Sequence, residues 1–165
     1  LIRAFAAIRR RADLPHILAL VGARGWMYDD LFALVQREGL GEHVNFVDYV
    51  ASDRLPLWYN SADLFAYPSA YEGFGLPVLE AMACGVPVIT SASSALVELA
   101  GDAAITVPPG SQEALELALM RVLGDEALRA QMRAKGLIRA SAFSWDRTAS
   151  NTIAVYERAL AEGVS

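Results

Sequence analysis

Residues 72–80 read E-G-F-G-L-P-V-L-E, and the chain runs on as A-M-A-C-G-V-P-V-I to residue 89. Gly73 and Gly75 leave the first turn free of Cβ atoms, so a ligand can approach the main chain there. Pro77 suits the first turn of a helix, because the N–H that proline lacks would have no partner inside that helix. The stretch therefore predicts a turn, then a helix, then a buried strand.

Short apolar runs alternate with helical patterns along the rest of the chain. Each run is continuously apolar, as expected for parallel strands that are covered on both faces. This alternation predicts an α/β fold with a doubly wound parallel sheet, in one domain over residues 1–165. The predicted strands are His16–Val21, Val44–Val47, Asp63–Tyr67, Val86–Thr90 and Ala103–Val107. The predicted helices, after a first one that begins at Leu1, are Met27–Glu38, Ser52–Asn60, Leu76–Ala83, Leu96–Ala100, Gln112–Leu123, Asp125–Ala140 and Trp145–Ala161.

The C-terminal third of the chain is predicted to be amphipathic helix. Ser144 is the expected N-cap of the last helix, and Asp146 lies in its first turn. An apolar stripe follows, made of Ile153, Val155, Tyr156 and Leu160. We expect this stripe to serve packing; a groove for a partner helix is the alternative.

Composition narrows the class of protein. Fourteen basic and 19 acidic residues give a net charge of −5 without clustered Lys or Arg, which disfavours a nucleic-acid groove. A single cysteine, Cys84, excludes an internal disulfide and fits a reducing compartment. No apolar run is long enough to span a bilayer, and residues 1–11 show no signal peptide. A hydrophobic content of 55% and a mean hydropathy of +0.31 predict that some apolar surface lies against a partner.

The polar residues gather at the predicted carboxyl ends of the strands, where such sheets bind ligands. The N-terminus of the helix at Leu76 offers free N–H groups and partial positive charge, which favour a phosphate or diphosphate. Glu72 and Glu80 flank the same point, and two anions beside a diphosphate should meet hydroxyl groups instead. A metal site is the weaker alternative, because no D-x-D pair or acidic cluster completes it. Taken alone, either glutamate could equally be a helix cap or dipole partner.

The whole string resembles the nucleotide-sugar-binding signature of the GT4 family (group 1) of retaining GT-B glycosyltransferases, whose mark is a Glu, seven residues and a second Glu. The resemblance extends over nearly the entire chain. It includes V-G-A-R-G-W at 21–26, F-V-D-Y-V at 46–50, the block at 57–89, G-D-A-A at 101–104 and F-S-W at 143–145. The first of these loops and the pair Ser93–Ser94 are most similar to the mannosyltransferase-like branch, which favours a GDP-sugar donor.

The resemblance implies a role for each part of the motif. Glu80 would hold the ribose hydroxyls, and Glu72 would contact the transferred sugar as the catalytic residue. The backbone of Gly73 and of Phe74 to Val78, that is Phe74, Gly75, Leu76, Pro77 and Val78, would bind the sugar and diphosphate. Main-chain atoms of Tyr49 and Val50 would meet the base, and the Gly22 loop the phosphate region. Arg24 is our addition, as the one basic residue of that loop; a solvated arginine is the equal alternative.

The chain matches only the C-terminal, donor-binding half of a GT-B enzyme, a Rossmann-like domain followed by C-terminal helices. The resemblance thus implies that the first strand and the N-terminal acceptor domain are missing, together with an Arg and a Lys that precede Leu1. We expect metal-independent, retaining transfer to a glycan or lipid-linked sugar, as in polysaccharide biosynthesis, with no cofactor and with this fragment inactive alone. The expected location is the cytoplasm, with peripheral association at the inner face of the membrane through the absent half as an option.

Three other functions compete with this interpretation. The first is a non-catalytic sugar-nucleotide-binding or assembly module of the same fold, against which the intact pair Glu72 and Glu80 argues. The second is a sugar-nucleotide epimerase, which would need acids from the absent half. The third, a redox dehydrogenase, is disfavoured because no G-x-G-x-x-G follows the first strand.

Overall fold

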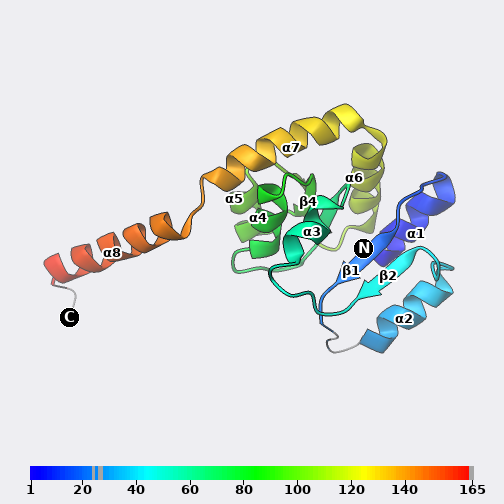
Figure 1. Ribbon diagram of the computed structural model, residues 1–165, viewed down its shortest axis with the longest axis horizontal. Helices are drawn as coiled ribbons and strands as arrows, with labels where there is room; N and C mark the ends of the chain where they lie inside the picture. Colours follow the sequence, from blue (N-terminus) through cyan, green and yellow to red (C-terminus); the bar gives the residue numbers. More distant parts are fainter. Residues whose placement is uncertain (24, 26–27, 164–165) are drawn as a thin grey trace.

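The computed structural model describes residues 1–23, 25 and 28–163, and these form an α/β arrangement of parallel strands and helices (Figure 1). The strands are β1 (Leu18–Val21), β2 (Val44–Val47), β3 (Phe65–Tyr67), β4 (Val88–Ser91) and β5 (Ile105–Val107). The helices are α1 (Ile2–Arg11), α2 (Tyr28–Arg37), α3 (Leu55–Asn60), α4 (Leu76–Ala83), α5 (Ser94–Ala100), α6 (Gln112–Gly124), α7 (Glu126–Ser141) and α8 (Trp145–Ala161).

Every predicted strand is present, although four of the five begin two residues later than predicted. β4 illustrates the physical reason, because Pro87 has no N–H to donate to a ladder and the strand starts at Val88. Among the helices, α3 begins at Leu55 rather than Ser52, after a turn. α5 begins at Ser94 rather than Leu96, and the predicted start of α2 at Met27 lies outside the described residues.

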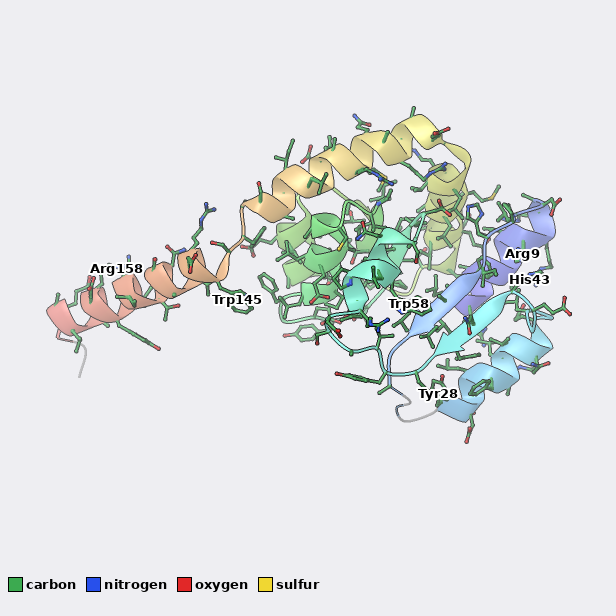
Figure 2. The ribbon with its side chains drawn as sticks, in the orientation of Figure 1. Arg9, Tyr28, His43, Trp58, Trp145 and Arg158 are labelled. Carbon is green, nitrogen blue, oxygen red and sulfur yellow. The ribbon has the colours of Figure 1, made fainter. Side chains whose placement is uncertain are left out.

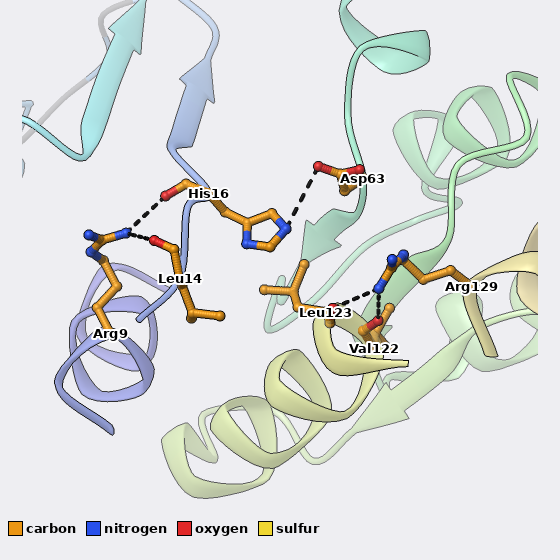
Figure 3. A network of polar contacts seen from close by, with 7 residues as sticks. All are labelled: Arg9, Leu14, His16, Asp63, Val122, Leu123 and Arg129. Atoms are coloured by element: carbon orange, nitrogen blue, oxygen red, sulfur yellow. Dashed lines mark hydrogen bonds and ion pairs between the residues drawn. The ribbon is translucent and has the colours of Figure 1, made fainter. Parts of the chain in front are cut away.

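The described strands form two parallel sheets, β1–β2 and β3–β4–β5, where the sequence predicted one. Leu18 pairs with Val44 in the first sheet, and Phe65 pairs with Val88 in the second. The N-terminus lies between the two sheets (Figure 1). At their amino ends the sheets approach one another, where Nε2 of His16, before β1, lies 3.8 Å from Oδ2 of Asp63, before β3 (Figure 3).

β4 is the centre of the second sheet, and all four of its residues are buried. Successive side chains of a strand point to opposite faces. Ile89 accordingly joins a core built from α1, α2, β1, β2, β5 and α6, whereas Val88 joins a second core built around α4 and α5. For this strand, the predicted cover on both faces is confirmed.

β1 does not follow the prediction of two covered faces. Its residues alternate between half-buried and exposed along the strand. Leu18 and Leu20 pack against the core that α1 and α2 cover, whereas Ile17 and Val21 are 64% and 43% exposed. One face of the β1–β2 sheet is therefore open to solvent, with the apolar side chains of Ile17 and Val21 on it beside the exposed Asn45 of β2.

α8 projects away from the rest of the molecule, as Figures 1 and 2 show for its labelled residues Trp145 and Arg158. The predicted cap is confirmed, because the Ser144 hydroxyl accepts a hydrogen bond from the Arg147 N–H at 3.2 Å. The apolar stripe is also present but none of its residues is buried. The packing predicted for it is thus not made by the described part of this chain. None of the described helices is both long and apolar enough to cross a membrane.

Candidate functional site

The predicted turn and helix lie at the carboxyl end of β3, as the sequence indicated. Gly75 is the residue before α4, with a φ of +99°, and its carbonyl accepts hydrogen bonds from Val78 N–H at 2.9 Å and from Leu79 N–H at 3.4 Å. Val78 therefore has its amide occupied and its side chain fully buried, and Pro77 has no N–H. Within the described structure, the first turn of α4 offers the Leu76 N–H as its open donor, beside those of the loop from Gly73 to Gly75.

The two glycines of the turn serve different purposes. A Cβ atom at Gly73 would meet nothing within 4 Å, so the main chain there is open to a ligand, as predicted. A Cβ atom at Gly75 would lie 2.5 Å from Cδ2 of Leu96 in α5. Gly75 is therefore required by its left-handed backbone and by close packing on α5, rather than by the approach of a ligand.

Both signature glutamates accept a hydrogen bond from a tyrosine. The Tyr59 hydroxyl in α3 donates to Oε2 of Glu80 at 2.9 Å, and the Tyr67 hydroxyl at the end of β3 donates to Oε1 of Glu72 at 2.6 Å. Glu80 is exposed and Glu72 is half-buried. The sequence did not identify either tyrosine, since 21 residues separate Tyr59 from Glu80 and only the fold brings them together.

These contacts set the ionisation of the groups. The hydrogen bond from Tyr67, with a smaller contribution from Ser69, holds the pKa of Glu72 below its usual range. Burial and the bond to Glu72 raise the pKa of Tyr67 to about 12. Burial and the bond to Glu80 likewise raise the pKa of Tyr59. Near neutral pH both tyrosines are therefore neutral phenols that can donate a hydrogen bond. Glu72, the acceptor of the Tyr67 bond, is ionised.

Phe74 anchors the signature loop to a distant part of the chain. Its ring lies 6.1 Å from that of Phe143, edge to face, at the junction between α7 and α8. The Arg139 guanidinium lies 5.0 Å from the same Phe143 ring and donates to the carbonyl oxygens of Leu99 and Glu98 at the end of α5. Phe143, the first residue of the F-S-W motif, therefore packs against the loop that carries Glu72.

The remaining predicted site residues lie on the other sheet. Gly22 follows β1 and is exposed, Tyr49 is 73% exposed after β2, and Val50 beside it is half-buried. They share the carboxyl edge of the strands with α4, in agreement with the expected placement. Arg24 lies outside the described residues.

A cavity of about 430 Å³ opens at the same edge, at the junction of the two sheets. Its walls come from the starts of α1 and α6, from α2 and from the ends of β1, β3 and β5, and they are mostly apolar. Among the predicted site residues that the structure describes, none lines it. The lining residues are Leu1, Ile2, Arg3, Leu20, Leu31, Leu34, Pro68, Val107, Pro108, Gly110, Ser111, Gln112 and Leu115. We place the polar site at α4 rather than in this cavity, because leucine walls do not suit a charged ligand.

Among the described residues, no group of three or more His, Cys, Asp or Glu side chains is arranged so that it could hold a metal ion. Glu72 and Glu80 instead accept hydrogen bonds from tyrosine hydroxyls, and both lie near the N-terminus of α4 in the sequence. This arrangement can accept hydrogen bonds from hydroxyl groups and can donate backbone N–H groups to an anion.

A family model described as glycosyl transferases group 1 matches residues 1–138. The chain belongs to this family. A relative in the family, O-antigen chain mannosyltransferase B of Escherichia coli, is 38% identical over 157 residues, which are 95% of this chain and 41% of that protein. The chain thus spans about two fifths of the length of such relatives.

Solved GT-B glycosyltransferase structures share the fold of this group 1 domain. Sucrose-phosphate synthase from Thermosynechococcus elongatus superimposes with a TM-score of 0.85 and 32% identity, covering 98% of this chain and 43% of that one. HepE from Anabaena in complex with UDP gives 0.82 and 26%, covering 96% and 44%. Another HepE structure, in complex with UDP-glucose, gives 0.79 and 25%, with the same coverage. The Rossmann-like half of a GT-B fold predicted from the sequence is confirmed.

Proposed function

We propose that this chain is the donor-binding domain of a retaining glycosyltransferase that uses a nucleoside-diphosphate sugar without a metal ion. The observation that carries the proposal is the pair Glu72 and Glu80 on either side of the α4 N-terminus, each oriented by a tyrosine hydroxyl. Membership of the group 1 family gives the reaction class, transfer of a sugar. The UDP and UDP-glucose complexes of HepE support a nucleotide-sugar donor for a domain of this shape.

The helix N-terminus and the carboxylates divide the donor between them. The open N–H groups at Gly73, Phe74, Gly75 and Leu76 would take the diphosphate, because they and the helix dipole favour an anion. Glu80 would accept from the ribose hydroxyls, each bond being strengthened by the charge of the carboxylate. The carboxylates stay clear of the phosphates, where like charges would repel.

Glu72 is placed to act during transfer. The hydrogen bond from Tyr67 favours its ionised form, and that carboxylate would stabilise the positive charge that develops on the sugar as the nucleoside diphosphate departs. The same α4 N-terminus would stabilise the departing diphosphate and so replace a metal ion in that role. Retention of configuration and a hexose as the transferred sugar are part of this proposal.

The donor base and the acceptor are the less constrained parts of the proposal. The relative named as a mannosyltransferase favours GDP-mannose as the first donor to test. Gly22, Tyr49 and Val50 provide the loop ends for the base and phosphates, on the neighbouring sheet. The acceptor, a glycan or lipid-linked sugar, would bind to other parts of the whole protein, and this domain alone would transfer nothing.

Calorimetric titration of the full-length protein with GDP-, UDP- and ADP-sugars tests the proposal. We expect one of the three to bind, and Glu80→Gln to weaken that binding by roughly tenfold, since it removes a charge-assisted acceptor but keeps the shape. Glu42→Gln, at an exposed position away from α4, is the matched control and should bind as the unmodified protein does. Absence of binding to all three donors, or full binding by Glu80→Gln, contradicts the proposal. Donor hydrolysis or transfer in the same protein separates an enzyme from a binding module.

A further inference from the structure

The two tyrosines that contact the signature glutamates belong to one row of aromatic rings. Phe65 and Tyr67 are two residues apart in β3, so their side chains lie on the same face, and their rings are stacked with centroids 5.9 Å apart. Tyr59 in α3 packs edge to face on Phe65 at 5.4 Å. All three rings pack against the core around α4 and α5.

The row has a hydroxyl group at each end, and each hydroxyl meets one signature carboxylate. Tyr59 donates to Oε2 of Glu80, and Tyr67 donates to Oε1 of Glu72. The Tyr59 bond uses Oε2 of Glu80 and leaves Oε1 for a ligand, whereas Glu72 receives the Tyr67 bond on Oε1 and a further hydrogen bond from Ser69. A carboxylate has about four acceptor positions, so a tyrosine bond does not prevent a sugar hydroxyl from binding to the same group.

Packing alone does not account for this arrangement. Phenylalanine would fill the same space in the row, and a hydroxyl group on a partly buried ring must find a partner to offset its loss of water. Glutamate side chains that are largely free in solvent lose rotamer freedom when they bind a ligand. A hydroxyl fixed by a rigid ring reduces that loss beforehand, because the carboxylate is already held in one orientation.

We propose that Tyr59 and Tyr67 are positioning residues of the donor site, holding Glu80 for the ribose and Glu72 for the transferred sugar. This inference rests on the proposed function. It adds to that function by naming the residue that orients each of the two glutamates. Tyr59 acts on binding of the nucleotide through Glu80. Tyr67 acts on the transfer step through Glu72, by holding that carboxylate in one orientation.

Removal of one hydroxyl at a time tests the two roles. Tyr59→Phe and Tyr67→Phe keep the ring packing, and Tyr71→Phe is the matched control, since Tyr71 is 81% exposed in the loop next to Glu72. In the full-length protein, we expect Tyr59→Phe to raise the Kd of the donor roughly fivefold to tenfold with kcat little changed. Tyr67→Phe should lower kcat by a similar factor and leave the Kd of the free nucleoside diphosphate unchanged.

The pH dependence gives a readout that a purely structural role would not move. The bond from Tyr67 lowers the pKa of Glu72, so its loss raises that pKa, and the acid limb of kcat moves to higher pH in Tyr67→Phe. Carbon NMR of the labelled Glu72 carboxyl should show the same upward movement in the 165-residue chain or the full-length protein. Tyr71→Phe should shift neither the acid limb nor the titration.

The outcomes separate this inference from the proposed function. If donor binding falls in Glu80→Gln but both tyrosine variants keep the Kd, kcat and Glu72 titration of the unmodified protein, the positioning role is wrong and the proposed function stands. If the unmodified protein binds no nucleotide sugar, both are wrong. Thermal unfolding of each variant should match that of the unmodified protein. If a variant unfolds at a lower temperature, its activity does not report on the hydroxyl alone. The NMR titration of Glu72, measured below that temperature, then tests the positioning role on folded protein.

Discussion

The two strand blocks of this domain differ in how completely they are packed. The β3–β5 block surrounds β4, which is buried on both faces, whereas β1 exposes every second residue on one side. The groups with the strongest chemistry, Glu72, Glu80 and their two tyrosines, all belong to the first block. The β1–β2 block contributes loop ends such as Gly22 and Tyr49. Under the proposed function, the side chains that need exact orientation would belong to the more completely packed block, and the main-chain contacts to the less completely packed one.

The largest effect should come from breaking the packed block at its signature loop. Gly75→Ala forces a Cβ atom to within 2.5 Å of Leu96 at a φ of +99°, and we expect it to lower the free energy of unfolding by about 2 to 4 kcal/mol. Gly73→Ala, two residues away in open space, should change it by less than about 0.5 kcal/mol. Chemical denaturation of the two variants checks this. Equal losses of unfolding free energy in the two variants would show that neither the contact with Leu96 nor the left-handed backbone makes alanine costly at position 75.

An intermediate effect should appear at the facing edges of the two blocks. The Leu18 N–H donates to the carbonyl of His43, just before β2, and the Phe65 N–H donates to that of Pro87, just before β4. The amides of Ala19, Val21 and Ala66 therefore point away from those partners, toward the other block. The family resemblance implies a strand that precedes α1 in the whole protein, and we predict that it would lie between β1 and β3 by the right-handed crossover rule. Hydrogen exchange at these three amides should then be slower, by roughly tenfold or more, in the full-length protein than in this chain.

Leu18 and Phe65 serve as internal controls for that measurement, since their amides are already bonded in the chain. Exchange rates of Ala19, Val21 and Ala66 that are the same in both proteins would contradict the prediction of an added strand. Slower exchange at Ala19 and Val21 in the full-length protein would show that the open edge of the β1–β2 block is covered there.

The smallest effect should come from the contact between His16 and Asp63 at the amino ends of the blocks (Figure 3). Asp63→Asn removes the charge that faces His16 at 3.8 Å, but the Asp63 side chain is 67% exposed. Solvent-exposed pairs contribute little, so we expect the free energy of unfolding to change by less than about 0.5 kcal/mol. A loss above about 1 kcal/mol in chemical denaturation would mean that this contact holds the blocks together.

Most elements could be predicted because the local pattern decides them. Continuous apolar runs located each strand, and the G-L-P sequence located the start of α4. The division into two sheets could not be predicted, since it depends on which strand edges meet. The reason for Gly75 is a contact with Leu96, 21 positions further along the chain, and it has no local signal.

The two acids of the candidate site were singled out from the sequence, and their tyrosine partners were not. Spacing and charge left the role of Glu72 and Glu80 open, the family resemblance decided for them, and that role stays a prediction. Tyr59 and Tyr67 look like ordinary core aromatics until the fold places their hydroxyls against the carboxylates. The apolar stripe of α8 was also predicted, yet a stripe gives no information on what covers it.

The burial of β4 on both faces limits which amino-acid substitutions this strand can accept. Ile89 belongs to one core and Val88 to the other, so a change of side-chain volume in the strand must be compensated by different helices on each side. Two neighbouring substitutions in β4 would need independent compensations in separate cores. Lineages that carry this domain therefore have less freedom to vary in β4 than in β1, where every second side chain faces water.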